Sequence, residues 1–162
     1  MTTMTELTGP PVAGTTLELL DRARSSLLAA CLARVVSERY VEAHLGALRA
    51  AAALLAARSR PARRSRLRSV WEVLPHVAPE LGEWAVFFTA SGRRRIAVER
   101  GAVVPSTREA DDLLRAAETF LGLVQTALGL PMERILPAFT VTTTVGAGAG
   151  AGLGSGVTAD VR

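Results

Sequence analysis

Arginine is the residue whose number and spacing first suggest chemistry in this chain. Residues 59–69, SRPARRSRLRS, hold five arginines and a sixth directly precedes them, so that a first cluster comprises Arg58, Arg60, Arg63, Arg64, Arg66 and Arg68. A second cluster comprises Arg93, Arg94, Arg95 and Arg100. A guanidinium group can donate two parallel hydrogen bonds to one phosphate. The clusters therefore predict contact with the backbone of RNA or DNA, independent of base sequence and weakened by salt.

A second interpretation of the two clusters stays open. Both could be solvated, the first as a loop between helices and the second as a helix C-terminus, where cations offset the helix dipole. Aromatic residues do not alternate with the arginines, and the nearest one, Trp71, belongs to an apolar pattern. Stacking of single-stranded bases on aromatic side chains is therefore not expected.

The other residue types that can do chemistry are sparse. His44, His76 and the single cysteine, Cys31, are scattered and lack the spacing of a zinc site. Asp111 and Asp112 fall in the first turn of a predicted helix, where carboxylates offset the dipole. The chain has no lysine, which excludes a P-loop, and the stretch GAGAGAGLGSG follows no predicted strand. We therefore predict no metal and no cofactor.

Composition favours a single helical domain. The chain has 162 residues, of which 49% are hydrophobic, many of them alanine, and only 4% aromatic. This balance favours closely packed helices. The net charge of +4 permits an anionic partner without requiring one. The N-terminal residues do not resemble a secretory signal, and the longest apolar run, residues 50–57, is too short to span a membrane. A soluble cytoplasmic protein is expected.

Capping signals predict where the helices begin. A Ser or Thr followed three residues later by Glu forms a capping box, and such boxes begin at Thr15, Ser69 and Ser106. Ser37 is expected to cap the second helix. Pro79 suits the first turn of the fourth. These signals predict four long helices, with one short helix after Ser69.

The predicted helix ends rest on proline and glycine. The first helix is expected to end near Val35, and the second near Arg58, because Pro61 prevents continuation. The last two helices are expected to end before Gly101 and Gly129, since glycine adopts the left-handed conformation that closes many helices.

Hydrophobic periodicity predicts which faces are buried. The second helix has an apolar side made of Tyr40, Val41, Leu45, Leu48, Leu54 and Leu55. Its opposite side, with Arg39, Glu42 and Arg49, is expected to face solvent. Residues 50–53, all alanine, leave room for a close neighbour. The last helix has the most regular stripe, Ala110, Leu113, Leu114, Ala117, Phe120, Leu121, Val124 and Leu128. Cys31, among apolar neighbours, is expected to be a buried thiol.

Together these signals predict an all-α fold. Short connections imply antiparallel neighbours, so we expect an up-and-down bundle of four long helices and one short helix. Residues 15–136 are predicted to form the bundle, and residues 1–14 to be disordered. Residues 137–162, which are rich in glycine and alanine, are predicted to be a disordered tail.

Three stretches resemble the HEPN domain family. They are ERYVEAHLGALRAAAALLAARSRP, SVWEVLPHVAPELGEWAVFF and READDLLRAAETFLGLV, and together they extend over roughly residues 17–128. More narrowly, they resemble a small HEPN subfamily of unknown function that is frequent in high-GC actinobacteria. The resemblance implies a helical bundle, often a homodimer. It also implies one of two roles, since many HEPN proteins are ribonucleases and others are binding or scaffold modules.

The ribonuclease role requires an arginine and a histidine separated by four to six residues, late in the bundle and facing a cleft at the dimer interface. Only Arg39 and His44 have this spacing here, and they lie in the second helix. Residues five apart on a continuous helix differ by about 140° in direction. His44 is therefore expected to point into the apolar side of the helix, bonded to a neighbour, and Arg39 towards solvent.

At the position that the resemblance implies, the histidine is missing. Arg94 or Arg95 can stand for the family's arginine, but Glu99 follows Arg95 four residues later. A carboxyl group with an ordinary pKa near 4.3 is a poor acid at neutral pH. We therefore expect a non-catalytic interaction module that binds RNA or DNA through its arginines. The alternatives are a metal-independent ribonuclease and a scaffold for a protein partner.

Overall fold

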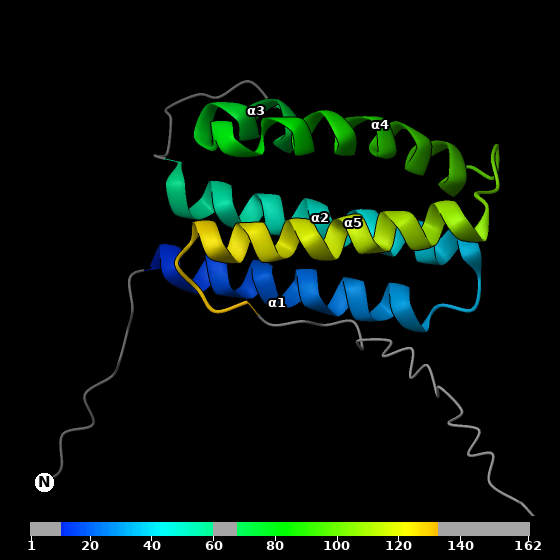
Figure 1. Ribbon diagram of the computed structural model, residues 1–162, viewed down its shortest axis with the longest axis horizontal. Coiled ribbons are helices and arrows are strands. Elements are labelled where there is room, and N and C mark those ends of the chain that lie inside the picture. Colours follow the sequence, from blue (N-terminus) through cyan, green and yellow to red (C-terminus); the bar gives the residue numbers. More distant parts are fainter. Residues whose placement is uncertain (1–10, 60–67, 133–162) are drawn as a thin grey trace, which may run out of the picture.

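The structure, a computed structural model, describes residues 11–59 and 68–132. That part of the chain contains, in order, α1 (Pro11–Leu32), α2 (Val36–Arg58), α3 (Val70–Val77), the short 3-10 helix η1 (Pro79–Leu81), α4 (Gly82–Glu99) and α5 (Thr107–Ala127). The long helices run side by side in alternating directions, with the short α3 beside the first half of α4 (Figure 1). The predicted all-α bundle of four long helices and one short helix is confirmed. None of the described helices is both long and apolar enough to cross a membrane.

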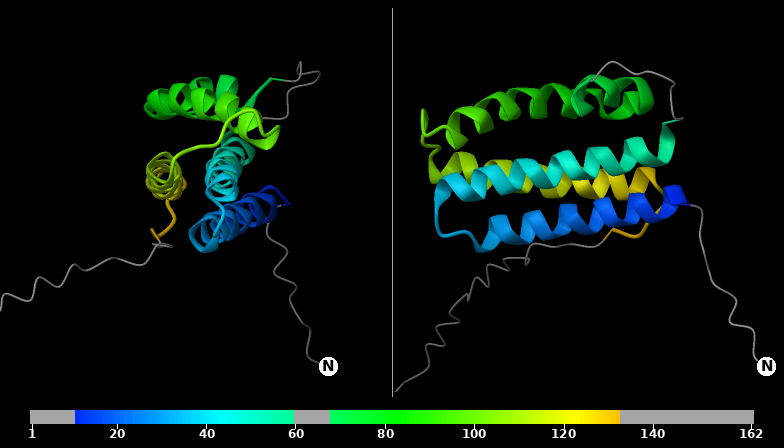
Figure 2. Two further views of the ribbon diagram at one scale, coloured as in Figure 1. Left: turned by 90° about the vertical axis from the view of Figure 1, so that its right-hand side faces the viewer. Right: turned by 180° about the vertical axis from the view of Figure 1, so that it is seen from behind.

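Helix α2 lies at the centre of the bundle. It packs against α1, α3, α4 and α5, whereas α1 otherwise contacts only α5. Seen end-on, α1 lies below α2, α5 beside it and α4 above it (Figure 2). Consequently only residues near the two ends of α2, Glu38, Ala57 and Arg58, are exposed.

Local signals define both ends of α5 and the start of α3. Ser69 and Ser106 each form the predicted capping box, with Glu72 and Glu109 respectively. Gly129, with φ of 70°, follows the last turn of α5, and Gly101, with the same φ, follows α4. Seven of the eight residues of the predicted α5 stripe are buried, Leu128 being the exception. These predictions, each of which depends on residues close in sequence, are confirmed.

The predicted starts of α1 and α2 are wrong. α1 begins at Pro11, so residues 11–14, predicted to be disordered, form its first turn and Thr15 lies inside the helix. Proline suits that turn because its missing N–H would have no partner there. α2 begins at Val36, after Val35 in an extended conformation, and Ser37 is inside the helix rather than capping it. The other residues predicted to be disordered, 1–10 and 137–162, lie outside the described part.

The outer side of α1 is more exposed than the sequence suggests. The helix ends at Leu32, which is 71% exposed, and Leu28 is 48% exposed. Cys31 is only partly buried, contrary to the expectation of a buried thiol. The reason is that α1 lies at the edge of the bundle, where it contacts α2 and α5 alone among the described helices.

The buried line of α2 consists of small residues. Besides Tyr40, His44 and Leu54, its buried residues are Ala43, Gly46, Ala47, Ala50, Ala51 and Ala53. Four of the six residues of the predicted apolar side, Val41, Leu45, Leu48 and Leu55, are only partly buried. The closest approach is at Gly46, where a Cβ atom would lie 2.6 Å from Cδ2 of Leu27 and 3.3 Å from the carbonyl oxygen of Ala23. Small side chains therefore set the distance between α1 and α2.

The polar side of α2 does not face solvent, contrary to the prediction. Arg49 donates to the hydroxyl oxygen of Ser26 on α1, and Ser26 donates to Glu42 at 2.8 Å. Arg39 is paired with α5. Because α2 has neighbours all around it, its charged side chains bind those neighbours instead of water.

Replacing Gly46 with alanine tests this close approach. A Cβ atom must displace the fully buried Leu27, at a cost of about 1–3 kcal/mol. The higher helix propensity of alanine offsets about 1 kcal/mol of this cost. We expect Gly46→Ala to lower the free energy of unfolding in urea by about 1 kcal/mol. Gly82→Ala is the control, since no atom lies within 4 Å of its Cβ position. Equal stability of the two variants would contradict the close approach.

Candidate functional site

His44 is buried between α2 and α4. Its side chain is 2% exposed, and its Nδ1 atom lies 2.9 Å from the hydroxyl oxygen of Ser91 on α4. The ring meets Trp71 and Phe88 edge-on. A Cβ atom on Gly92 would lie only 3.2 Å from the imidazole Cε1. As predicted, the imidazole points inward and bonds a neighbour.

The hydrogen bonds of Ser91 indicate which histidine tautomer is present. The hydroxyl oxygen lies 3.2 Å from the carbonyl oxygen of Phe88, to which it donates. Its single proton cannot also bond to His44, so both contacts are satisfied only if Nδ1–H of His44 donates to Ser91. A histidine that donates to a serine does not activate that serine as a nucleophile. The pair is therefore a packing contact between α2 and α4.

The surroundings of His44 keep it neutral. Burial, and secondarily the nearby charge of Arg95, lower its pKa from 6.5 to about 4. A general acid or base works best with a pKa near the operating pH. His44 is therefore a weak base at neutral pH, and its burial also separates it from solvent.

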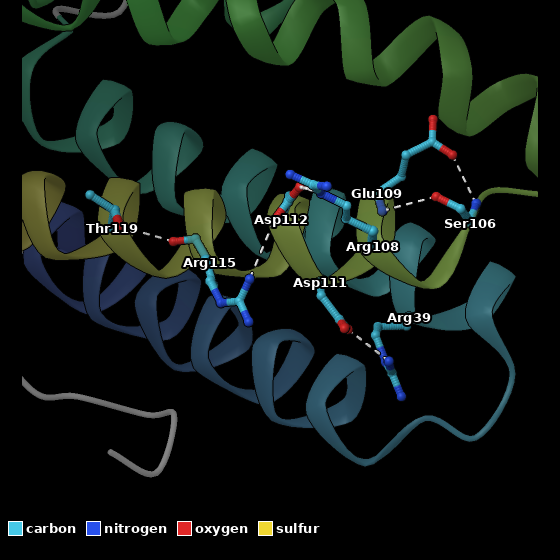
Figure 3. Close-up of polar contacts among 8 residues, drawn as sticks. All are labelled: Arg39, Ser106, Arg108, Glu109, Asp111, Asp112, Arg115 and Thr119. Atoms are coloured by element: carbon cyan, nitrogen blue, oxygen red, sulfur yellow. Dashed lines mark hydrogen bonds and ion pairs between the residues drawn. The ribbon is translucent and has the colours of Figure 1, made fainter. Parts of the chain in front are cut away.

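Arg39 points to a different part of the bundle. One guanidinium nitrogen donates to the carboxylate of Asp111 on α5 at 2.7 Å, and another donates to the carbonyl oxygen of Ala33 at 3.0 Å. Figure 3 shows this pair at the start of α5. The sequence predicted that Arg39 faces solvent, but its side chain is only 21% exposed. Because His44 bonds α4 and Arg39 bonds α5, the two do not converge on one site.

Two of the four arginines of the second cluster, Arg94 and Arg95, are also paired. Arg94 lies 2.6 Å from Glu109 of α5, and Arg95 lies 3.5 Å from Glu99, one turn further along α4. Hydrogen bonds from Ser106 at the helix N-terminus, followed by the charge of Arg94, hold the pKa of Glu109 below its ordinary value. Of this cluster, Arg93 and Arg100 are exposed. Within the described residues neither forms an ion pair.

The first arginine cluster lies mostly outside the described part, which includes only Arg58 and Arg68. Arg58 donates to Glu80 at 2.7 Å and to the carbonyl oxygen of Ala127 at 3.0 Å, so it joins the end of α2 to η1 and α5. The hydrogen bond from Arg58 lowers the pKa of Glu80. Arg68 is exposed, directly before α3. Arg60, Arg63, Arg64 and Arg66 are outside the described residues.

The acidic candidates are likewise held by arginines. Asp112 lies 3.3 Å from Arg115 and 3.6 Å from Arg108, both on α5, while Asp111 binds Arg39 (Figure 3). His76 is exposed near the end of α3. Over residues 11–59 and 68–132, no three His, Cys, Asp or Glu side chains come together as metal ligands would.

Among the surface grooves that border α4 in the described part of the chain, two have nearly the same volume, and neither was predicted from the sequence. One, of about 350 Å³, lies between α3 and α4 and includes Trp71, Pro75, Val86 and Arg93. The other, of about 340 Å³, lies between α4 and α5 and includes Tyr40, Phe87, Ser91, Arg94, Glu109 and Asp112. Burial raises the pKa of Tyr40. Hydrophobic patterns identify buried faces, but a groove depends on the spacing of helices far apart in sequence.

The family model of SAV_6107-like HEPN domains matches residues 30–125, from the end of α1 almost to the end of α5. The chain belongs to this HEPN family. No curated protein and no solved structure matches the chain significantly. The resemblance recognised from the three sequence stretches is therefore confirmed.

Within this HEPN domain, two residues at the position where the resemblance led us to expect a ribonuclease pair form an internal ion pair. Arg95 is followed by Glu99 instead of histidine, and the two side chains bind each other across one turn of α4. The histidine nearest in space is His44, whose pKa the charge of Arg95 lowers. That histidine comes from α2, and no spacing within one helix could have predicted that Arg95 and His44 are neighbours.

The buried imidazole of this HEPN domain predicts a pH dependence of stability. His44 binds its proton with a pKa of about 4 when folded and about 6.5 when unfolded. Between these values the unfolded state holds more protons, so stability falls as pH decreases. The stabilisation that comes from holding His44 neutral is fully present above about pH 7. It is lost as the pH falls, and the loss in the free energy of unfolding approaches about 3 kcal/mol near pH 4.

Urea unfolding at several pH values between 7.5 and 4 measures this effect. In the variant His44→Gln we expect most of the decrease in the free energy of unfolding between pH 6.5 and pH 4 to be absent, even if the variant is less stable than the wild type at every pH. The matched variant His76→Gln, at an exposed histidine, should keep the wild-type profile. Identical profiles for wild type and His44→Gln would show that the imidazole is not held neutral.

Proposed function

We propose that this HEPN domain is a non-catalytic interaction module that acts as a homodimer. The observation that carries the proposal is that each candidate reactive side chain forms a hydrogen bond or an ion pair with another residue of the same chain. His44 is buried and bonded to Ser91, and Arg39 is bonded to Asp111. A homodimer is what the family resemblance implies, and an uncovered apolar surface on α4 supports it.

The chemistry of RNA cleavage supports the same proposal. Cleavage without a metal needs a group that exchanges a proton at neutral pH within reach of the substrate. The pKa of His44 is about 4 and its side chain is 2% exposed. Glu99 is exposed, but it is a carboxylate already paired with Arg95. Neither residue has the properties of a proton donor to a leaving group.

Incubation of the protein with end-labelled RNA in the presence of a chelator tests the absence of catalysis. We expect no cleavage above that of a preparation of Arg95→Ala, because Arg95 is one of the two arginines, with Arg94, that can stand for the arginine of the family's ribonuclease pair. Equal traces of cleavage in both preparations would indicate a contaminant. Cleavage by the wild type that is lost in Arg95→Ala or His44→Ala would establish the alternative function, a metal-independent ribonuclease.

A second candidate function, binding of a nucleic-acid backbone, is favoured by the position of Arg93. Arg93 is exposed beside the groove between α3 and α4, and no described residue forms an ion pair with it. Arg68 is exposed directly before α3. The arginines at 60, 63, 64 and 66 immediately precede Arg68 in the chain. Arg58, Arg94 and Arg95 support this function less, because each has an internal partner.

Titration of a fluorescent oligonucleotide at several salt concentrations tests backbone binding. Each phosphate contact contributes about 0.9 to the slope of log affinity against log salt. Replacing Arg63, Arg64 and Arg66 with alanine should therefore reduce the slope by about 2–3 if all three contact phosphate. The control variant, Arg108→Ala/Arg115→Ala, removes exposed arginines of α5 and should keep the wild-type slope. If the wild-type protein does not bind the oligonucleotide, nucleic-acid binding is excluded and a scaffold for a protein partner is the alternative that remains.

A further inference from the structure

Helix α4 presents an uncovered apolar surface. Its first half contains the apolar run WAVFF, residues 84–88, which extends around all sides of the helix, as is typical of a helix with neighbours all around it. In the described part α4 packs against α2, α3 and η1 and reaches α5 through Phe88 and Arg94, and its outer side has no neighbour. Val86 is therefore 73% exposed and Phe87 46% exposed, with the exposed Ala90 beside them. These three residues form a ridge between the two grooves that flank α4.

The spacing of the exposed residues is that of a helix-pairing seam. The exposed residues Glu83, Val86, Ala90 and Arg93 are separated by three, four and three residues, and the partly buried Ala97 follows four residues later; this is the repeat with which two helices pack along their length. Ala90, at the middle, is small enough to allow the close approach of a second helix. We call these five residues, together with Phe87, the α4 seam.

The charges of the seam identify its occupant. The seam has one carboxylate, Glu83, near the start of α4 and one unpaired guanidinium, Arg93, ten residues later, with the apolar ridge between them. No other described residue forms an ion pair with either of them. If a second copy is turned by a two-fold axis near Phe88, Glu83 meets the partner's Arg93 and Val86 meets the partner's Ala90. An antiparallel copy of the seam is therefore complementary to it in both charge and shape.

We propose that two copies of this chain pair in an antiparallel arrangement along the α4 seam. In this arrangement Val86 of each copy enters the other's groove between α3 and α4, and Phe87 enters the other's groove between α4 and α5. Two symmetric ion pairs between Glu83 and Arg93 fix the register of the helices. This inference rests on the proposed homodimer and specifies the surface through which it forms.

A charge exchange tests the antiparallel register directly. Glu83→Arg alone places two arginines opposite each other, and Arg93→Glu alone places two carboxylates opposite each other. At low ionic strength, where such charges are least screened, each change should raise the dimer dissociation constant at least about tenfold. Sedimentation of an equal mixture of the two variants should show a heterodimer with near wild-type affinity, because every pair in it is again opposite in charge. The double variant Glu83→Arg/Arg93→Glu should likewise dimerise.

A second set of variants tests the apolar ridge. Val86→Asp should raise the dissociation constant by at least about tenfold, since it places a charge in the buried centre of the interface. Val104→Asp is the matched control, because Val104 is 77% exposed and lies outside α4. Circular dichroism establishes whether the variants keep their helices.

The outcomes distinguish the proposed surface from the proposed homodimer. A wild-type protein that stays monomeric at every concentration would overturn both. A dimer that responds equally to Val86→Asp and Val104→Asp, or whose charge variants do not recombine, would overturn the α4 seam and leave the homodimer with another interface. Recombination of the two charge variants would support the antiparallel seam, because a parallel pair of helices does not bring Glu83 to Arg93.

Discussion

The position of α2 at the centre of the bundle is the constraint on which the other features depend. A helix with neighbours on every side cannot leave its polar side chains to water, and a buried polar group without a partner destabilises the fold. Each polar residue of its middle part therefore binds another helix. Glu42 and Arg49 meet Ser26 of α1, Arg39 meets α5, and His44 meets α4. The side chains that could have formed a reactive pair instead hold the bundle together.

Features set by neighbouring residues could be predicted from the sequence. The capping boxes at Ser69 and Ser106 need only four consecutive residues, and the stripe of α5 follows from one periodic pattern. The solvent-facing side assigned to α2 was wrong because a helical wheel shows which residues share a side but not how many neighbours the helix has. The same limit explains Gln125, which no apolar pattern includes. It is fully buried, and neither of its amide atoms has a hydrogen-bond partner among the described residues.

The candidate site was predictable only in part. The opposite directions of Arg39 and His44 follow from the geometry of one helix, and the structure places them on different neighbours. The partners themselves, Asp111 and Ser91, lie 72 and 47 residues away in the chain. Without an account of how the helices pack, neither partner could be inferred from residue type. The effect of Arg95 on the pKa of His44 has the same origin.

Helix α4 contains both the residues that depart from the ribonuclease pattern and the residues of the proposed interface. A ribonuclease pair at this position would need an arginine and a histidine directed towards a wet cleft. Here the inner side of α4 bonds His44, and Arg94 and Arg95 of its second half bind carboxylates of the same chain. What remains on its outer side is the apolar ridge of Val86, Phe87 and Ala90, bounded by Glu83 and Arg93. Burying such an apolar surface against another helix, and so excluding water from it, is favourable. The inner side and the second half of α4 therefore make contacts within the chain, and a different set of residues, on its outer side, is available for the proposed pairing.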